Sequence, residues 1–285
     1  MKIEILSEVH SEVGEGPLWN LAERTITWVD ITGKKWHKLS LATGAVTTHS
    51  VPTMIGAIVE CLDGTYQGAV EEGFAKLQTG VDGYVVTHDF LPPEVRMNDA
   101  KADAKGRWWA GSNAIDFTAG VGKVHRLNID GSVTTMIDGL TLPNGLGWSP
   151  DNKNFYLIDT FARALYKYDF DLESGEISNK SLLVEFKDDG SYPDGMCVAS
   201  DGTLLVAMWS GERIEVISPE GKFLSTIKVP VKSPTSCAFG GDDGKTLIVT
   251  SDGRDFDASK YPDSGKLFGI TGTGFGAIES AKYHG

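Results

Sequence analysis

The chain has 285 residues and carries 26 Lys and Arg against 39 Asp and Glu, which gives a formal net charge of −13. Such a chain repels phosphate backbones, so we do not expect nucleic acid as a partner. No run of 18 apolar residues occurs and the N-terminus lacks an apolar stretch of signal-peptide length, so we expect neither membrane insertion nor export and predict a cytoplasmic location.

Composition favours a β-rich fold. The 34 Gly and 11 Pro, together with a hydrophobic fraction of 41%, indicate many turns and therefore many short strands. Because no linker-like stretch interrupts the chain and all-β folds of this length occur as one unit, we predict a single domain over residues 1–285. Three widely spaced cysteines, Cys61, Cys197 and Cys237, argue against a disulfide framework and favour a reducing compartment.

Strand signals appear along the whole chain, separated by turn-forming pairs. The first is an isolated run at residues 3–6. The clearest later runs, in chain order, are 25–29, 108–110, 123–127, 133–137, 155–158, 164–168, 204–207, 223–227 and 247–249. They either alternate apolar and polar residues or are short and apolar throughout, which is typical of half-buried and fully buried strands respectively.

The turns repeat with a period of 40 to 50 residues. Markers at Gly64, Gly106, Asn152, Gly202 and Gly244 lie 42, 46, 50 and 42 residues apart, and one step back reaches Glu23. A second turn follows within each of the six units, at 43–44, 82–83, 130–131, 174–175, 220–221 and 271–272. Four strands in each of six units predict an all-β, six-bladed β-propeller with antiparallel blades. We expect run 3–6 to close the ring as the outer strand of the last blade. The alternative is a β-sandwich or a non-repeating β fold.

One repeat position carries oxygen-bearing side chains. The residues eight before each marker are Glu15, Gly56, Asn98, Asn144, Asp194 and Ser236. The first strand of a propeller blade lines the central channel, so these residues are predicted to meet there. Two carboxylates and two amides buried together are unfavourable without a partner, and oxygen ligands select hard divalent cations such as Ca²⁺, Mg²⁺ or Mn²⁺. Taken singly, Asn144 and Asp194 also fit as turn residues, because each precedes a glycine.

Two further residues are candidates for binding substrate. Arg96 lies two residues before Asn98 and could bind an oxyanion or a hydroxyl-rich molecule, or form a salt bridge to a loop acid. Asp116 follows a strand and begins a long loop. Its side chain could accept hydrogen bonds from a substrate, or it could be a solvated loop acid. The chain lacks a Gly-x-Ser-x-Gly elbow and none of its six histidines occupies the repeat position. Metal-assisted hydrolysis therefore fits better than serine-triad or zinc–histidine chemistry.

Seven motifs, in order along the chain, resemble the senescence marker protein/gluconolactonase family of regucalcin-like sugar lactonases. They are Gly14-Glu15-Gly16-Pro17-Leu18-Trp19, Arg96-Met97-Asn98-Asp99-Ala100-Lys101, Pro143-Asn144-Gly145-Leu146, Ser149-Pro150-Asp151, Tyr156-Leu157-Ile158-Asp159-Thr160, Tyr192-Pro193-Asp194-Gly195-Met196 and Cys237-Ala238-Phe239-Gly240-Gly241. The resemblance implies a six-bladed propeller with one divalent ion in its channel.

The same resemblance assigns roles to the candidate residues. It implies Glu15, Asn144 and Asp194 as the metal ligands, with Asp194 also the catalytic base. Arg96 and Asn98 are implied as the substrate-binding pair. Asp116 falls where some members have a glutamate that contacts the sugar, and an aspartate has a shorter reach. Family members are reported with Ca²⁺, Zn²⁺, Mn²⁺, Mg²⁺ or Fe²⁺, and Ca²⁺ is the first choice for this chain.

We therefore predict a metal-dependent lactonase that hydrolyses a gluconolactone-like aldonolactone to the aldonic acid. In the predicted reaction the cation polarises the lactone carbonyl and Asp194 activates water. The predicted partner is a small-molecule sugar lactone, and the sequence gives no signal for an oligomeric state. Two alternatives remain open: a metal-dependent esterase or organophosphate hydrolase on the same fold, and a non-catalytic calcium-binding propeller.

Overall fold

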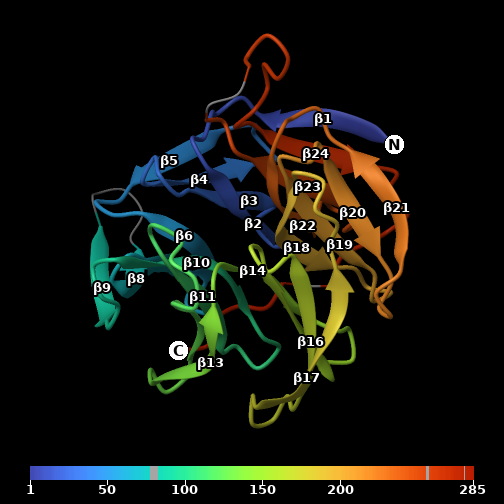
Figure 1. Cartoon of the computed structure of the whole chain (residues 1–285). Coiled ribbons are helices and arrows are strands. Elements are labelled where there is room, and N and C mark those ends of the chain that lie inside the picture. Colours follow the sequence, from blue (N-terminus) through green and yellow to red (C-terminus); the bar gives the residue numbers. More distant parts are fainter. Residues whose placement is uncertain (78–82, 255–256, 279) are drawn as a thin grey trace.

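The computed structural model describes residues 1–77, 83–254, 257–278 and 280–285. Within these residues there are strands and no helix, and the strands form six sheets of four. The sheets are antiparallel and are arranged around a central axis like the blades of a fan (Figure 1). The predicted six-bladed β-propeller is confirmed.

Each blade runs from the axis outwards in chain order, except the sixth. Blade 1 holds β2 (Gly14–Asn20), β3 (Thr25–Asp30), β4 (Lys35–Ser40) and β5 (Val46–Ser50), and blade 2 holds β6 (Ile55–Glu60), β7 (Tyr66–Val70), β8 (Gly73–Leu77) and β9 (Tyr84–Asp89). Blade 3 holds β10 (Val95–Ala102), β11 (Trp108–Ala114), β12 (Gly122–Leu127) and β13 (Val133–Leu140), and blade 4 holds β14 (Pro143–Trp148), β15 (Asn154–Asp159), β16 (Ala164–Phe170) and β17 (Ile177–Glu185). Blade 5 holds β18 (Tyr192–Val198), β19 (Leu204–Trp209), β20 (Arg213–Ile217) and β21 (Phe223–Lys228). Blade 6 holds β22 (Pro234–Gly240), β23 (Thr246–Ser251), β24 (Leu267–Thr271) and, from the other end of the chain, β1 (Lys2–Ser7).

The two ends of the chain close the ring in blade 6. β1 pairs antiparallel with β24, with Lys2 opposite Thr271 and Ile5 opposite Phe268. The predicted role of run 3–6 as the outer strand of the last blade is therefore confirmed. The predicted turn at 271–272 ends β24 without leading to a fourth strand, because β1 already fills that place. The predicted turn at 82–83 lies partly outside the described residues, since residue 82 is not among them.

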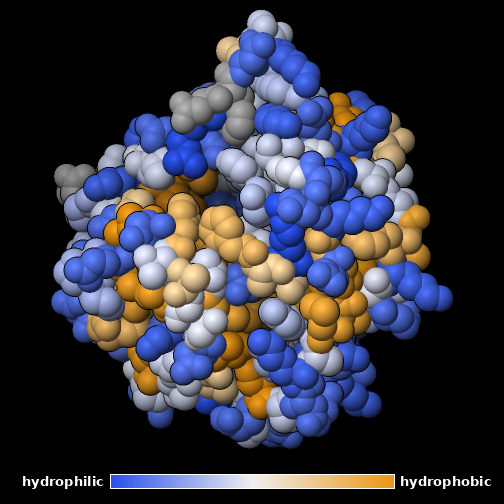
Figure 2. Space-filling view, viewed as in Figure 1, coloured by the Kyte–Doolittle hydropathy of each residue, from blue (hydrophilic) through white to orange (hydrophobic). Residues whose placement is uncertain are grey.

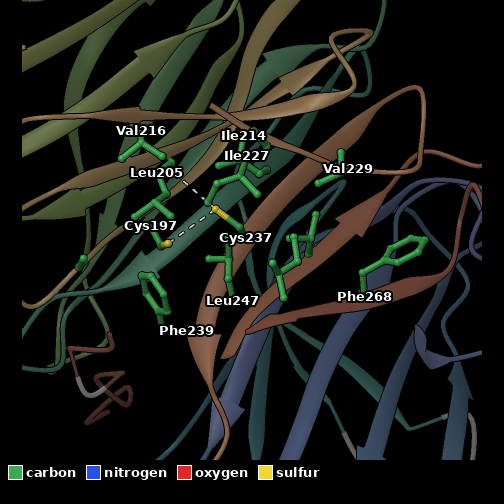
Figure 3. Close-up of a cluster of buried hydrophobic side chains, with 14 of the residues drawn as sticks. Cys197, Leu205, Ile214, Val216, Ile227, Val229, Cys237, Phe239, Leu247 and Phe268 are labelled. Atoms are coloured by element: carbon green, nitrogen blue, oxygen red, sulfur yellow. Dashed lines mark hydrogen bonds between the residues drawn. The ribbon is translucent and has the colours of Figure 1, made fainter. Parts of the chain in front are cut away.

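Apolar clusters fill the spaces between neighbouring blades. The described residues contain six such clusters, one for each pair of adjacent blades. Figure 3 shows the cluster between blades 5 and 6, where Cys197 lies next to Cys237 with their sulfur atoms 3.6 Å apart. Both cysteines are buried and free, as is Cys61. Burying a large aliphatic or aromatic side chain stabilises a fold by about 1.5–3 kcal/mol, so these clusters hold the blades together.

The first strand of every blade carries an irregularity at the same place. The pairing between the first and second strands shifts register between Glu15 and Leu18 in blade 1, and between Pro193 and Met196 in blade 5. Equivalent shifts occur in the other four blades. A β-bulge redirects side chains and frees backbone groups from the ladder. The side chains in these six bulges therefore point in directions different from those of the regular strands around them.

The last residues of the chain cross the opposite end of the channel. We call residues 272–278 and 280–285 the C-terminal strap. Its backbone forms hydrogen bonds with the first turns of four blades. The Ser200 amide donates to the carbonyl oxygen of Gly276 in the strap. The strap amides of Ala277, Tyr283 and His284 donate to the carbonyl oxygens of Gly244, Glu60 and Gly106 respectively. Figure 1 shows this red segment running across the middle of the ring and ending beside blade 3.

The outer surface is mainly hydrophilic. Figure 2 shows polar and charged side chains over most of the rim, with apolar residues reaching the surface toward the middle of the face shown. Among the described residues, no helix has the length and apolar character needed to cross a membrane.

Candidate functional site

The predicted oxygen-bearing residues occupy equivalent places at one end of the channel. We call Glu15, Asn98, Asn144, Asp194 and Ser236 the oxygen ring. Each is at most 9% exposed, and each lies at or within the bulge of its first strand. The bulges aim these side chains away from the regular ladder. The repeat position identified in the sequence therefore corresponds to one structural level of the propeller.

Glycines let the first strands approach each other closely at this level. At the sixth equivalent position, a Cβ on Gly56 would lie 2.5 Å from the carbonyl oxygen of Asn98. A Cβ on Gly145 would lie 2.7 Å from the carbonyl oxygen of Asp194, and one on Gly195 would lie 2.3 Å from Ser236 Oγ. No side chain fits into these gaps, because real Cβ atoms do not approach so closely. Gly56 therefore contributes no side-chain ligand atom, and the absence of a side chain lets blades 2 and 3 approach each other.

The two carboxylates of the oxygen ring are poorly compensated. Burial raises the pKa of Glu15 well above its usual range, and the nearby charges of Asp194 and Asp99 raise it further. Burial likewise raises the pKa of Asp194, and Asp99 and Asp252 add to the effect. Several acids therefore share one small volume, and a proton or a cation is needed to offset their repulsion.

Asn144 is held in one orientation by its neighbours. Its amide nitrogen donates to Thr160 Oγ1 at 3.1 Å, and the Thr160 hydroxyl donates to the carbonyl oxygen of Pro193 at 2.8 Å. The chain of bonds links blade 4 to blade 5. With the nitrogen bound to Thr160, the amide oxygen Oδ1 is the group that Asn144 can present to a cation.

Arg96 and Asn98 form a bonded pair beside the carboxylates. Arg96 Nη1 donates to Asn98 Oδ1 at 2.9 Å and to the carbonyl oxygen of Met97 at 2.8 Å. The Asn98 amide nitrogen donates to the carbonyl oxygen of Pro143 at 3.1 Å. Burial lowers the pKa of Arg96 to about 10, while the charges of Glu15 and Asp194 oppose the shift. The guanidinium stays charged at neutral pH, and its other N–H groups can face a ligand.

The residues present fit a hard divalent cation. Glu15 and Asp194 supply two carboxylates and Asn144 an amide oxygen, and oxygen sets of this kind suit Ca²⁺, Mg²⁺ or Mn²⁺. Two negative charges would balance the ion and relieve the repulsion that raises both pKa values. Across the part of the chain that is described, no three His, Cys, Asp or Glu side chains form a metal cluster by themselves. The amide oxygen would thus have to complete the ligand set.

Asp116 lies in the exposed turn that follows β11 and is not one of the buried residues of the oxygen ring. Its side chain is exposed, and Oδ1 accepts hydrogen bonds from the Thr118 amide at 2.9 Å and the Thr118 hydroxyl at 2.7 Å. These bonds lower the pKa of Asp116. The same Asp-x-Ser/Thr turn occurs at Asp63, between β6 and β7, and at Asp130, between β12 and β13. A role of Asp116 in substrate binding stays a prediction.

Several charged or polar residues near the oxygen ring were not singled out by the sequence analysis. Asp99 is 5% exposed, and its Oδ2 is buried without a hydrogen-bond partner among the described residues. Asp252 is buried and accepts bonds from Arg254 and Trp209. Asp99 could have been noticed because it lies in the bulge next to Asn98. Asp252 gives no such signal, since its position depends on how blade 6 packs against blade 5.

Comparison with known proteins gives full-length matches. The model of the SMP-30/Gluconolactonase/LRE-like region matches residues 13–253. Regucalcin of Danio rerio is 34% identical over 292 residues, which cover 100% of this chain and 99% of that protein. Among solved structures, a luciferin-regenerating enzyme is 31% identical with a TM-score of 0.91, covering 99% of both chains. A calcium-binding protein, regucalcin, from Agrobacterium tumefaciens strain C58 is 25% identical with a TM-score of 0.93, covering 98% of this chain and 96% of that one.

Proposed function

Because this chain belongs to the SMP-30/gluconolactonase/LRE-like family, as its motifs predicted, we propose that it is a cation-dependent hydrolase of sugar lactones. The family supports a lactonase-type function for a propeller of this kind. The observation that carries the proposal is the meeting of Glu15, Asn144 and Asp194 in a buried site whose acids repel one another. Such a site attracts a divalent cation and places it beside a guanidinium that can bind an oxygen-rich substrate.

Glu15, Asn144 and Asp194 would hold the cation. When bound, the ion polarises the lactone carbonyl and offsets the negative charge that develops on the carbonyl oxygen. Ca²⁺ is the first candidate, because the relative from A. tumefaciens is described as a calcium-binding protein. Zn²⁺, Mn²⁺, Mg²⁺ and Fe²⁺ remain alternatives to be compared in the same assay.

The chain's own residues perform the remaining steps. Arg96 and Asn98 orient the hydroxyl groups of the substrate. Asp194 accepts a proton from water as the water oxygen bonds to the carbonyl carbon, and the ring C–O bond then breaks. The alkoxide leaving group takes the proton from Asp194, which gives the open hydroxy acid and restores the carboxylate. The raised pKa of Asp194 in the absence of a cation means that cation binding and base function depend on the same deprotonation.

Asp194→Ala tests the assignment. A panel of sugar lactones is incubated with each of the five ions in turn, and acid release is followed. The wild type should hydrolyse at least one lactone in a cation-dependent way, and Asp194→Ala should lower kcat/KM by about a thousandfold because base and ligand are both lost.

Glu60→Gln is the matched control, because Glu60 is a buried acid at the opposite end of the channel. It should keep the wild-type rate. Full activity of Asp194→Ala with cation bound would contradict the catalytic assignment. Absence of cation-dependent hydrolysis of any lactone would contradict the proposed function.

A further inference from the structure

Four aromatic side chains follow one another around part of the oxygen ring. Phe117 contacts Phe161 with ring centroids 5.5 Å apart, Phe161 contacts Tyr192 at 5.8 Å, and Tyr192 contacts Trp209 at 6.2 Å. We call these four residues the aromatic arc. They come from three consecutive blades, since Phe117 follows β11, Phe161 follows β15, and Tyr192 and Trp209 belong to β18 and β19.

The aromatic arc lies at the same end of the propeller as the oxygen ring. Tyr192 is two residues before Asp194 in β18, which is about 7 Å along a strand. Phe161 directly follows Thr160, whose hydroxyl accepts the bond from Asn144. Phe117 comes three residues after Ala114, which pairs with Val95 at the start of the strand that carries Arg96. Trp209 pairs with Tyr192 across β18 and β19, so every member of the arc is connected to the site by strand pairing or by chain neighbours.

Two members of the aromatic arc expose apolar surface. Phe117 is 43% exposed and Phe161 is 46% exposed. Phe117 also has a φ of 61°, a left-handed conformation that is rare and unfavourable for a bulky residue. Exposed phenylalanines in contact, one of them in an unfavourable backbone conformation, add nothing to the buried core of the propeller. They offer an apolar surface beside the site instead.

The other two members are fixed in place. The guanidinium of Arg163 stacks on Tyr192 at 4.0 Å from the ring centroid and forms a salt bridge with Asp188 at 2.7 Å. The indole nitrogen of Trp209 donates to Asp252 Oδ2 at 3.2 Å. The arc therefore has a rigid half near Asp194 and an exposed half that follows Thr160 in blade 4 and β11 in blade 3. A preformed apolar surface needs little ordering when a ligand binds.

We propose that the aromatic arc is a subsite for an apolar group, preferably aromatic, carried by the lactone on the ring carbon remote from the carbonyl. This inference rests on the proposed function, because it places that group next to the residues that open the ring. Phenylalanine has no hydrogen-bonding group, so the exposed half of the arc favours an apolar substituent over a further hydroxyl group. The substrate class becomes lactones with an apolar substituent, and bare sugar lactones bind more weakly.

Two substrates that differ by one phenyl group test the subsite. The Ca²⁺-loaded protein is assayed with γ-butyrolactone and γ-phenyl-γ-butyrolactone. The phenyl group should raise kcat/KM by about tenfold or more, because burying a ring of this size is favourable by that amount. The gain should appear in KM, since the group is remote from the bond that breaks. In the double variant Phe117→Ser/Phe161→Ser the preference should fall to about twofold or less.

Phe223→Ser is the matched control, because Phe223 is 48% exposed on β21, the outer strand of blade 5. It should keep the full phenyl preference. Thermal unfolding of the variants checks that the fold is intact. Hydrolysis of both lactones at equal kcat/KM by the wild type would overturn the subsite and leave the proposed function standing.

Binding of the matching lactams separates the two proposals. 2-Pyrrolidinone and 5-phenyl-2-pyrrolidinone resist hydrolysis, and their affinities are measured by calorimetry. Tighter binding of the phenyl lactam that is lost in Phe117→Ser/Phe161→Ser supports the subsite even if no lactone is hydrolysed. Equal binding of both lactams by the wild type overturns it.

Discussion

The two ends of the propeller channel are built from the same first strands but differ in chemistry. At one end, bulges bring Glu15 and Asp194 together as buried acids with raised pKa values. Toward the other end, the channel holds a cavity of about 190 Å³ that is lined mainly by apolar residues and reaches the C-terminal strap. The strap bonds four blades there and buries Tyr283, which is 3% exposed.

The difference shows how one repeat can serve both binding and stability. The end with the oxygen ring keeps like charges close, which is unfavourable for the fold without a cation and favourable for binding one. At the end with the strap, apolar groups form most of the cavity lining, and the strap forms hydrogen bonds with backbone groups of four blades. Substitutions at the first end should therefore change cation binding and activity, and substitutions at the second should change stability.

The largest expected effect tests the strap. Tyr283→Ala should lower the free energy of unfolding by about 4 kcal/mol, because it leaves a cavity in the cluster between blades 2 and 3. Tyr283→Phe should lower it by about 1 kcal/mol, since only the hydrogen bond to the Asn128 carbonyl is lost. Urea unfolding measures both. Where the variants are folded, lactone hydrolysis should match the wild type. Loss of activity in folded Tyr283→Phe would break the division between the two ends.

The next effect concerns the response to a divalent cation. At about 100 times its dissociation constant, Ca²⁺ should stabilise the wild type by about 3 kcal/mol. The same concentration should stabilise Glu15→Gln by less than about 1 kcal/mol, because one carboxylate ligand is lost. In metal-free buffer Glu15→Gln should be at least as stable as the wild type, since a buried, repelled charge has been removed.

Glu60→Gln is again the control for the cation response. Glu60 is bonded to Asn20 and Lys282 at the strap end of the channel. Removing its charge should lower stability but leave the stabilisation by Ca²⁺ unchanged. Thermal unfolding with and without a chelator measures each value. An equal response of Glu15→Gln and the wild type would show that the cation binds elsewhere.

The smallest effect concerns the loss of stability at acidic pH. We expect titratable groups within the blades to contribute to this loss, as well as the acids of the channel. His125 on β12 is buried between the hydroxyls of Ser112 and Thr135, and burial lowers its pKa to about 4. The unfolded chain binds a proton near pH 6.5, so stability is lost as the pH falls from 6.5 toward 4. At pH 5 this one residue should reduce the free energy of unfolding by about 2 kcal/mol.

His125→Gln isolates that contribution. Glutamine does not titrate and can still bond Ser112, so the difference in stability between pH 7 and pH 5 should be about 2 kcal/mol smaller than in the wild type. Urea unfolding at both pH values, in metal-free buffer, measures it. An equal loss of unfolding free energy between pH 7 and pH 5 in the two proteins would mean that acid sensitivity arises at other groups. The acids of the oxygen ring would be the first of these to examine.

Much of the fold could be predicted because it depends on local patterns. Turn pairs such as Asp63-Gly64 and the alternation in strands like β12 are properties of short segments, and their spacing counted the blades and set their phase. The same phase located Glu15, Asn144 and Asp194 on equivalent bulges. The predictions of one domain, a cytoplasmic location and the role of each site residue stay predictions.

By itself, then, the sequence determined the six blades, the strand that closes the ring, and the repeat position at which oxygen-bearing side chains meet. Only the tertiary structure decided which residues surround them. The packing of Phe117 on Phe161 and the approach of Asp252 to Asp194 leave no periodic trace. They depend on contacts between different blades, whereas the repeat depends on hydrogen bonding and alternation within a blade.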